Sequence, residues 1–179
     1  MAKQRKKLLL VDGYNVLRSG MRYKGAFTNP DYTDDTFNTA RERLINDVVS
    51  YAGREYRAII VFDAAANAYS AGMPEKVGGV RIMFSPAGQS ADQVIEKLAH
   101  DARERQVETM VVSSDATIQD TVFGLGVDRM SADGFSREMG LYEEDARLDD
   151  APKVAHKRTV ADRIDPAVLA KLKALRDGR

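Results

Sequence analysis

Near its start the chain reads Lys7-Leu8-Leu9-Leu10-Val11-Asp12-Gly13-Tyr14-Asn15, and this stretch decides the fold class. An apolar, β-prone run ends abruptly in polar and turn-forming residues, which predicts a buried strand over 7–11 with Asp12 at its carboxyl end. A second short apolar strand, residues 58–62, runs in the same way into Asp63. Three more strands are predicted at residues 80–84, 109–112 and 127–130.

Helical patterns separate these strands. Apolar residues recur at helical spacing up to Ala52 in a helix that opens near Asp34, and Ser90-Ala-Asp-Gln93 is a capping box that opens another. A short helix is predicted to end near residue 123, and a longer one to run from Ser131 to about residue 148. Residues 64–79 are predicted to form a flexible loop. Strands that alternate with helices indicate an α/β fold, in which a parallel sheet is covered on both faces in three layers.

Composition bounds the class of protein. The chain has 179 residues, 44% of them apolar and 30% charged, which suits one soluble domain and excludes a largely disordered chain. It has no cysteine and two histidines, which excludes Cys-type zinc sites and disfavours histidine-ligated zinc. No apolar run approaches the roughly 20 residues that span a bilayer, and the basic start lacks the apolar core of a signal peptide. We therefore expect a cytoplasmic protein with no membrane segment.

The zero net charge hides a strong asymmetry along the chain. Residues 1–7 carry four basic side chains and no acidic one, and residues 153–179 carry eight basic and three acidic side chains, so residues 8–152 have a net charge of −9. We predict a domain over residues 1–148 and a basic linker with a C-terminal helix over 149–179, the linker running to about 165 and the helix spanning 167–176. The basic ends either act as solubilising tails or bind a polyanion.

Acidic residues gather where parallel strands end. Asp12, Asp63 and Asp115 follow three strands, while Asp92 and Glu96 lie four residues apart in the helix after the third strand. Converging carboxylates repel one another unless a cation compensates, and oxygen ligands without histidine or cysteine favour Mg²⁺ or Mn²⁺. Such ions support phosphoryl transfer or phosphodiester hydrolysis. Each acid alone could equally be a helix cap or a solvated loop charge.

Neighbouring polar residues are further candidates. Gly13 could form a tight turn that lets the backbone approach a ligand, with Asn15 donating a hydrogen bond, although Asp-Gly is a common turn. Ser113 and Ser114 could bind phosphate at the start of the next helix or simply cap it. The glycines do not form a dinucleotide-binding or P-loop motif.

Four segments in order resemble the NYN-domain proteins: Leu9–Val16, Val61–Ala64, Ser90–Glu96 and Val111–Asp115. The resemblance covers roughly residues 7–148 and looks closest to the YacP-like branch. It implies a ribosome-associated endoribonuclease in mRNA decay. The NYN domain is PIN-like, and the resemblance implies a central parallel sheet with strand order 3-2-1-4-5. That order would place the first and fourth strands side by side, with Asp12 and Asp115 as neighbours.

The resemblance also assigns roles residue by residue. Asp12 and Asp92 match the principal metal-binding carboxylates of the family, and Asp115 matches the third. Asn15 matches the asparagine that is expected to position metal or phosphate. The three aspartates are therefore the predicted catalytic and metal-binding residues, with Mg²⁺ or Mn²⁺ as cofactor.

Two further acids match the family less closely. Glu96 is predicted as an additional metal ligand, and Asp63 as a residue that contacts substrate. One departure follows the second strand, where the family often has F-D-A-H and this chain has Ala65 and Ala66 before Asn67. If the family's histidine contacts RNA, this chain lacks that contact.

The leading hypothesis is a metal-dependent endoribonuclease that acts on mRNA, with the ribosome as a possible partner. Residues 3–7 and 153–179 would bind RNA or the ribosome electrostatically, which predicts that binding weakens strongly with salt. An RNA- or ribosome-binding factor without catalysis is the rival from another class. A haloacid-dehalogenase-like phosphatase would need a second aspartate where Tyr14 stands, and a flap-type DNA nuclease would need a longer acidic set and a helical arch. The oligomeric state stays open.

Overall fold

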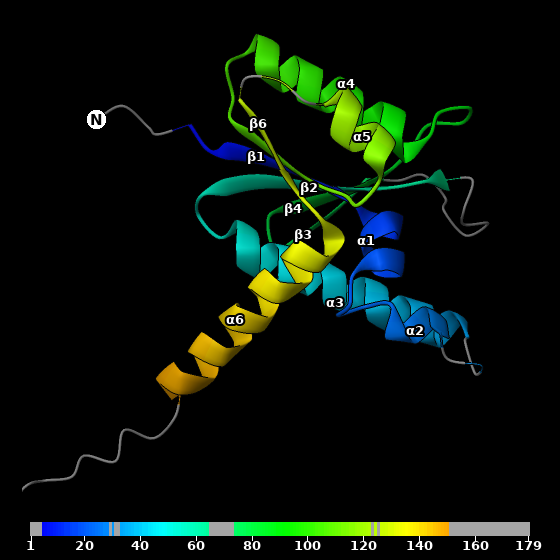
Figure 1. Cartoon of the computed structure of the whole chain (residues 1–179), viewed down its shortest axis with the longest axis vertical. Coiled ribbons are helices and arrows are strands. Elements are labelled where there is room, and N and C mark those ends of the chain that lie inside the picture. Colours follow the sequence, from blue (N-terminus) through cyan, green and yellow to red (C-terminus); the bar gives the residue numbers. More distant parts are fainter. Residues whose placement is uncertain are drawn as a thin grey trace, which may run out of the picture. The chain divides into compact units, whose positions relative to one another are not determined.

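The computed structural model describes residues 5–28, 30, 33–64, 74–122, 124 and 126–150. Most of the predicted linker, the predicted last helix and the basic segment 153–179 lie outside these residues, as do Lys3 and the departure at residues 65–67. The described part up to Glu144 belongs to one compact unit, which contains the sheet and the helices packed on it (Figure 1).

A twisted sheet forms the centre of the molecule. Its five parallel strands lie in the order β4-β2-β1-β5-β6, which is the predicted order 3-2-1-4-5. Buried parallel strands read as continuous apolar runs because both of their faces are covered, and β1 and β2 have this character. The strands are β1 (Lys7–Asp12), β2 (Tyr56–Phe62), β4 (Val80–Phe84), β5 (Thr109–Val112) and β6 (Val127–Met130).

A sixth strand corrects the predicted loop over residues 64–79. β3 (Glu75–Val77) pairs antiparallel with β4 and forms the edge of the sheet, so the sheet is mixed rather than purely parallel. Gly78 and Gly79 make the turn between the two strands with φ angles of 55° and 91°. Glycine adopts two successive positive φ angles at little cost, so Gly-Gly between Val77 and Val80 is a hairpin signal in the sequence.

Helices cover both faces of the sheet (Figure 1). The helices predicted within the described residues are present, whereas the one predicted over 167–176 lies outside them. Two short helices in residues 13–33, which were expected to be a loop, were not predicted. Thr33 caps α3, the Ser90–Gln93 capping box opens α4, and Gly53 ends α3, as the sequence indicates for the last two. The helices are α1 (Gly13–Ser19), α2 (Gly25–Thr28), α3 (Asp34–Ala52), α4 (Ala91–Glu104), α5 (Ala116–Thr121) and α6 (Ala132–Asp150).

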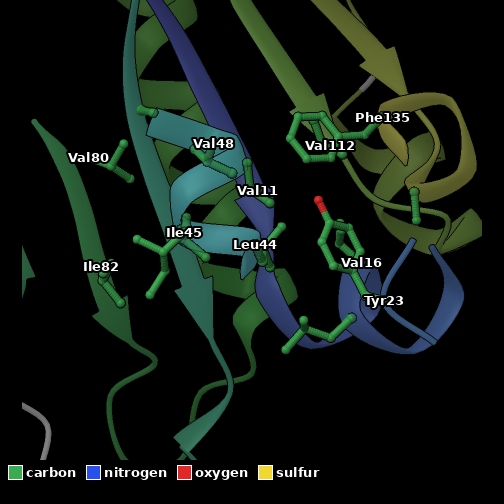
Figure 2. Packing of buried hydrophobic residues seen from close by; sticks show 14 of the residues in the cluster. Val11, Val16, Tyr23, Leu44, Ile45, Val48, Val80, Ile82, Val112 and Phe135 are labelled. Carbon is green, nitrogen blue, oxygen red and sulfur yellow. The ribbon is translucent and has the colours of Figure 1, made fainter. Parts of the chain in front are cut away.

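Two apolar layers hold these elements together. On one face, side chains of α3 such as Leu44 and Val48 pack beside Val11 of β1, and Phe135 from the first turn of α6 joins the same core (Figure 2). On the other face, α4 and α5 cover the sheet, with Ile95 fully buried. A fully buried aliphatic side chain stabilises the fold by about 1.5–3 kcal/mol. The buried side chains of these two layers therefore hold the helices against the sheet.

A partly buried polar network joins three elements on the α3 side. Arg22, in the turn after α1, makes two hydrogen bonds to Asp47 of α3, at 2.7 and 3.1 Å, and pairs with Glu143 of α6. The hydroxyl of Tyr23 donates to Asp47 at 2.6 Å. Burial and this hydrogen bond raise the pKa of Tyr23 far above its ordinary value, and the bonds to Glu143 and Asp47 raise the pKa of Arg22. The arginine therefore stays charged and paired in the interior.

Among the described residues, no helix has the length and apolar character needed to cross a membrane.

Candidate functional site

The carboxyl edge of the sheet brings the predicted acidic residues together. Strands β1, β2 and β5 are parallel neighbours, with Asp12 opposite Val61 and Val11 opposite Val112. Their carboxyl ends therefore lie side by side, and each ends in or is followed within three residues by an aspartate. In open α/β sheets this edge, where the strand order reverses at β1, is the usual place for a ligand. We call Asp12, Asp63, Asp92, Glu96 and Asp115 the acidic edge.

Asp12 is the most buried member, with 5% of its surface exposed. It caps α1 by accepting a hydrogen bond from the Asn15 N–H at 3.2 Å, and its other oxygen accepts one from the Ser113 hydroxyl at 3.3 Å. Burial raises the pKa of Asp12 to about 6, and the charges of Asp92 and Asp115 add to this rise, while the two hydrogen bonds oppose it. The carboxyl group is thus placed where its charge is costly unless a cation lies nearby.

A short hydrogen-bond chain links β1 to the turn after β5. The Asn15 side-chain oxygen accepts the Ser114 N–H at 2.7 Å, and the Ser113 hydroxyl accepts the Asp115 N–H at 3.1 Å. Asp115 itself caps α5 by accepting the Thr117 N–H at 2.7 Å. These contacts link Asp115, at the start of α5, to Asp12 at the end of the adjacent strand β1, as the strand order implies.

The two serines therefore act differently from simple caps of the next helix. Ser113 supports Asp12 and Asp115, and it is buried. The Ser114 hydroxyl accepts the N–H of Ala132, the first residue of α6, at 2.9 Å. The cap of α5 is Asp115, so the alternative in which one of the serines caps that helix is wrong.

Asp92 and Glu96 lie on one face of α4, as their four-residue spacing predicts. Burial raises the pKa of Asp92, followed by the charges of Asp115, Glu96 and Asp63. The Glu96 carboxylate accepts a hydrogen bond from the Thr121 hydroxyl of α5 at 2.7 Å. The capping box at Ser90 fixes the first turn of α4 and with it the position of Asp92.

Asp63 lies directly after β2 and is held from β4. The Ser85 hydroxyl is 3.5 Å from an Asp63 oxygen and accepts the Ala64 N–H at 3.0 Å. Ser85 and Thr121 support two acidic residues, and sequence reasoning missed both. Ser85 follows a strand that ends at the same edge, which was a usable signal, whereas only the packing of α5 on α4 reveals Thr121.

Gly13 has a structural role that differs from the expected turn. It is the first residue of α1, and a Cβ atom built on it would lie 2.3 Å from Cε1 of Phe62. The glycine therefore allows the start of α1 to pack against the end of β2. The expected tight turn at Asp12-Gly13 is wrong, because a helix starts there, while the approach of this backbone to a ligand stays a prediction.

The acidic edge fits a divalent cation in the chemistry of its donors. Its side chains are hard oxygen ligands, and the charges of Asp63, Asp92, Glu96 and Asp115 contribute to the raised pKa values of Asp12 and Asp92. In the described part of the chain, however, no three acidic or histidine side chains lie close enough to form a ready cation site. The carboxylates are close enough to raise one another's pKa values, and a bound cation would draw them closer together.

Comparison with known proteins assigns the family. The family model described as "YacP-like NYN domain" matches residues 9–177, which is most of the chain. The chain belongs to the YacP-like NYN domain family. The NYN domain is nuclease-like, and nucleases of the NYN and PIN-like group typically use divalent metals.

Relatives of this family member come from Bacillus subtilis. The protein described as "Uncharacterized protein YacP" from strain 168 is 34% identical over 141 residues, which cover 76% of each chain. The crystal structure of Rae1 (YacP) superposes with a TM-score of 0.63 at 29% identity, covering 96% of this chain and 95% of that one. A crystal structure of a mutant of the same protein gives a TM-score of 0.62 over 94% and 99% of the two chains.

Proposed function

We propose that this protein is a metal-dependent endoribonuclease whose active centre is the acidic edge. The observation that supports this most directly is the electrostatic coupling of Asp12, Asp92 and Asp115, which come from β1, α4 and the turn after β5. Mutually repelling carboxylates at a topological switch point, one of them buried, destabilise a fold, and they are expected where a cation and a phosphate bind. Membership of a nuclease-like family agrees with this function.

Each residue has a stated task in this proposal. Asp12, Asp92 and Asp115, with Glu96, would hold Mg²⁺ or Mn²⁺. When bound, the cation would neutralise charge on the scissile phosphate and lower the pKa of the attacking water. Ser113 and Thr121 orient the carboxylates through the hydrogen bonds described above.

Polar groups beside the carboxylates would position the substrate. The Asn15 side-chain oxygen is occupied by the Ser114 N–H, so the amide orientation is set and its NH₂ group is directed to donate elsewhere. We assign that group, with Asp63 and the backbone around Ser113 and Ser114, to contacts with RNA.

The proposed substrate is mRNA, with the ribosome as a partner and the cytoplasm as the location. The basic residues at the start of the chain and in the segment 153–179 support a polyanionic partner, because closely spaced cations bind phosphate through release of counterions. Binding should therefore weaken steeply with salt.

A second candidate is an RNA- or ribosome-binding factor without catalysis. One observation favours it, namely that no described group of three acidic side chains is already close enough to hold a metal ion. This factor would keep salt-sensitive RNA binding, and RNA length would not change under any metal condition.

The experiment is cleavage of end-labelled RNA with Mg²⁺, with Mn²⁺ and with EDTA, each with and without ribosomes. We expect internal cuts that need the metal and are absent in Asp12→Asn, and a ribosome requirement would support the proposed partner. Retained RNA binding with no cut in any condition would refute the nuclease and favour the binding factor.

A further inference from the structure

A basic groove lies at the opposite, amino edge of the sheet. Five cationic side chains line it together with Tyr56, Gly79 and Val107, and the groove has a volume of about 810 Å³. We define the basic groove by its cations, which are Arg5, Lys6, Arg57, Lys76 and Arg105.

The topology explains why these residues meet. Arg5 and Lys6 precede β1, Arg57 is the second residue of β2, and β1 pairs with β2 so that Leu8 lies opposite Arg57. Lys76 belongs to the antiparallel edge strand, and Arg105 follows the last residue of α4. Separate pieces of chain thus bring cations to one end of the parallel strands.

The cations of the groove have no acidic partner in the described part of the chain. None of the five forms an ion pair there, whereas Lys7 beside them is bound to Glu108 at 2.9 Å and lies 3.9 Å from Glu55. Five like charges around one groove repel one another, and this costs stability. An external polyanion would remove that cost.

The groove and the acidic edge cannot contact the same phosphate. They lie at opposite ends of β2, whose seven residues span roughly 23 Å at about 3.3 Å per residue. An RNA held in the groove would therefore be bound through nucleotides other than those at the acidic edge.

The aromatic residue of the groove argues against single-stranded RNA there. Proteins that bind single strands stack bases on open aromatic faces. Among the described residues that line the groove, Tyr56 is the single aromatic one, and one face of its ring already stacks on Tyr51, with ring centroids 5.8 Å apart and planes at 24°. Double-stranded RNA is instead recognised through its phosphates and shape, which needs cations and no stacking platform.

We propose that the basic groove binds the phosphate backbone of a double-stranded RNA segment that is distinct from the segment cleaved at the acidic edge. The choice of RNA over an acidic protein rests on the proposed function. It also rests on the lining, because protein partners are anchored by buried apolar side chains and the groove offers only Tyr56 and Val107.

The test measures binding of an RNA hairpin across a range of salt concentrations in EDTA, so that no cleavage occurs. The groove variant of the full chain is Arg57→Gln/Lys76→Gln/Arg105→Gln. The control variant loses the same charge at exposed positions outside the groove, before α2, in α3 and in α6, as Lys24→Gln/Arg43→Gln/Arg137→Gln. Each lost phosphate contact lowers the slope of log K against log salt by roughly 0.9.

We expect the groove variant to bind the hairpin at least tenfold more weakly, with a salt slope that is smaller by about 2–3. The control should stay within about threefold of the unaltered protein. Metal-dependent cleavage of a short single strand should be equal in all three proteins, because the groove does not contact it.

Equal hairpin binding by the groove variant and the unaltered protein would overturn the proposal. So would displacement of the hairpin by poly-glutamate at equal charge concentration, since the groove would then suit an acidic protein. Selective loss of hairpin binding would support the groove even if the unaltered protein cleaved no RNA, and that result would refute the proposed function alone.

Discussion

At the scale of single residues, the charge of Asp12 lowers the stability of the fold, although the proposed metal binding needs that charge. Its pKa of about 6 in the folded protein lies above the ordinary value of 3.8, mainly because the carboxyl group is buried. Between these values the folded state holds more protons than the unfolded state, so the free energy of unfolding falls as the pH rises from about 4 to 6. Above that window the full cost of the buried charge remains.

Asp12→Asn should therefore stabilise the protein at neutral pH while removing activity. Asparagine removes the charge and keeps the oxygen that accepts the Asn15 N–H, and the loss of the weaker bond from the Ser113 hydroxyl offsets only part of the gain. We expect a gain of roughly 2–3 kcal/mol in the free energy of unfolding at pH 7.5 and little change at pH 4, measured by urea unfolding without divalent cations.

The exposed Asp120→Asn serves as the control and should change stability little at either pH. A lower stability of Asp12→Asn at pH 7.5 would contradict the burial argument. Added Mg²⁺ should stabilise the unaltered protein more than the variant, because the cation offsets the charge that the variant lacks.

Gly13 provides a second residue-scale prediction. A methyl group at this position would overlap the ring of Phe62, so Gly13→Ala should lower the free energy of unfolding by about 1–3 kcal/mol in thermal or urea denaturation. A methyl group on Gly140 in α6 would meet no atom within 4 Å, so Gly140→Ala should instead stabilise the helix by roughly 0.5–1 kcal/mol. Equal effects of the two substitutions would contradict the proposed packing.

The positions of the acidic residues could be predicted from the sequence, but their contacts could not. Strand ends and helix spacing placed Asp12, Asp63, Asp92 and Glu96 at one edge, because these positions follow from local patterns. The burial of Asp12 and the bond from Thr121 to Glu96 depend on packing between distant segments. No local pattern encodes such contacts, so they required the structure.

At the scale of elements, the capping box of α4 links folding to the site. The Ser90 hydroxyl accepts the Gln93 N–H at 3.2 Å, and the Gln93 side chain accepts the Ser90 N–H at 3.1 Å. Ser90→Ala should cost about 1 kcal/mol in the free energy of unfolding and slow RNA cleavage, because the first turn of α4 carries Asp92. Ser50→Ala, within α3, should be neutral or stabilising, and the same loss in both variants would contradict this role.

Elements with a strong local signature were predicted, and those without one were not. α3 and α4 have long apolar periodicity and caps, so their starts follow from the sequence. α1 has seven residues and begins with Gly13, which resembles a turn, and β3 has only three residues. α1 depends on packing against the end of β2, and β3 depends on pairing with β4. For β3, Gly78-Gly79 was a sequence signal of the hairpin.

At the scale of the whole molecule, the network around Arg22 joins the turn after α1 to α3 and α6. Asp47→Ala should lower the free energy of unfolding by about 2–4 kcal/mol, because the partly buried guanidinium would keep only its pair with Glu143 and the buried Tyr23 hydroxyl would lose its acceptor. Glu75→Gln breaks the exposed pair with Arg41 and should cost no more than about 1 kcal/mol. Similar costs in urea unfolding would contradict the burial of this network.

The order of the parallel strands was predictable only through the family resemblance. Alternating strands and helices indicate a parallel sheet, but many orders satisfy that pattern. The four ordered motifs implied 3-2-1-4-5, which the five parallel strands have. Neither the pattern of strands and helices nor the family resemblance predicted the basic groove, because its five cations come from segments that only the folded sheet brings together.

The central claim is that the acidic edge cleaves RNA, and one comparison along a single helix tests it most directly. Asp92 and Asp101 both lie in α4 and both are partly exposed, but only Asp92 is coupled to the other acids of the edge. The measurement is the single-turnover rate constant for cleavage of labelled RNA with Mn²⁺ by Asp92→Asn and Asp101→Asn. We predict a loss for Asp92→Asn that exceeds the roughly 10- to 100-fold cost of losing a supporting residue, and little change for Asp101→Asn. Full activity of Asp92→Asn, or equal losses in both, would contradict the claim.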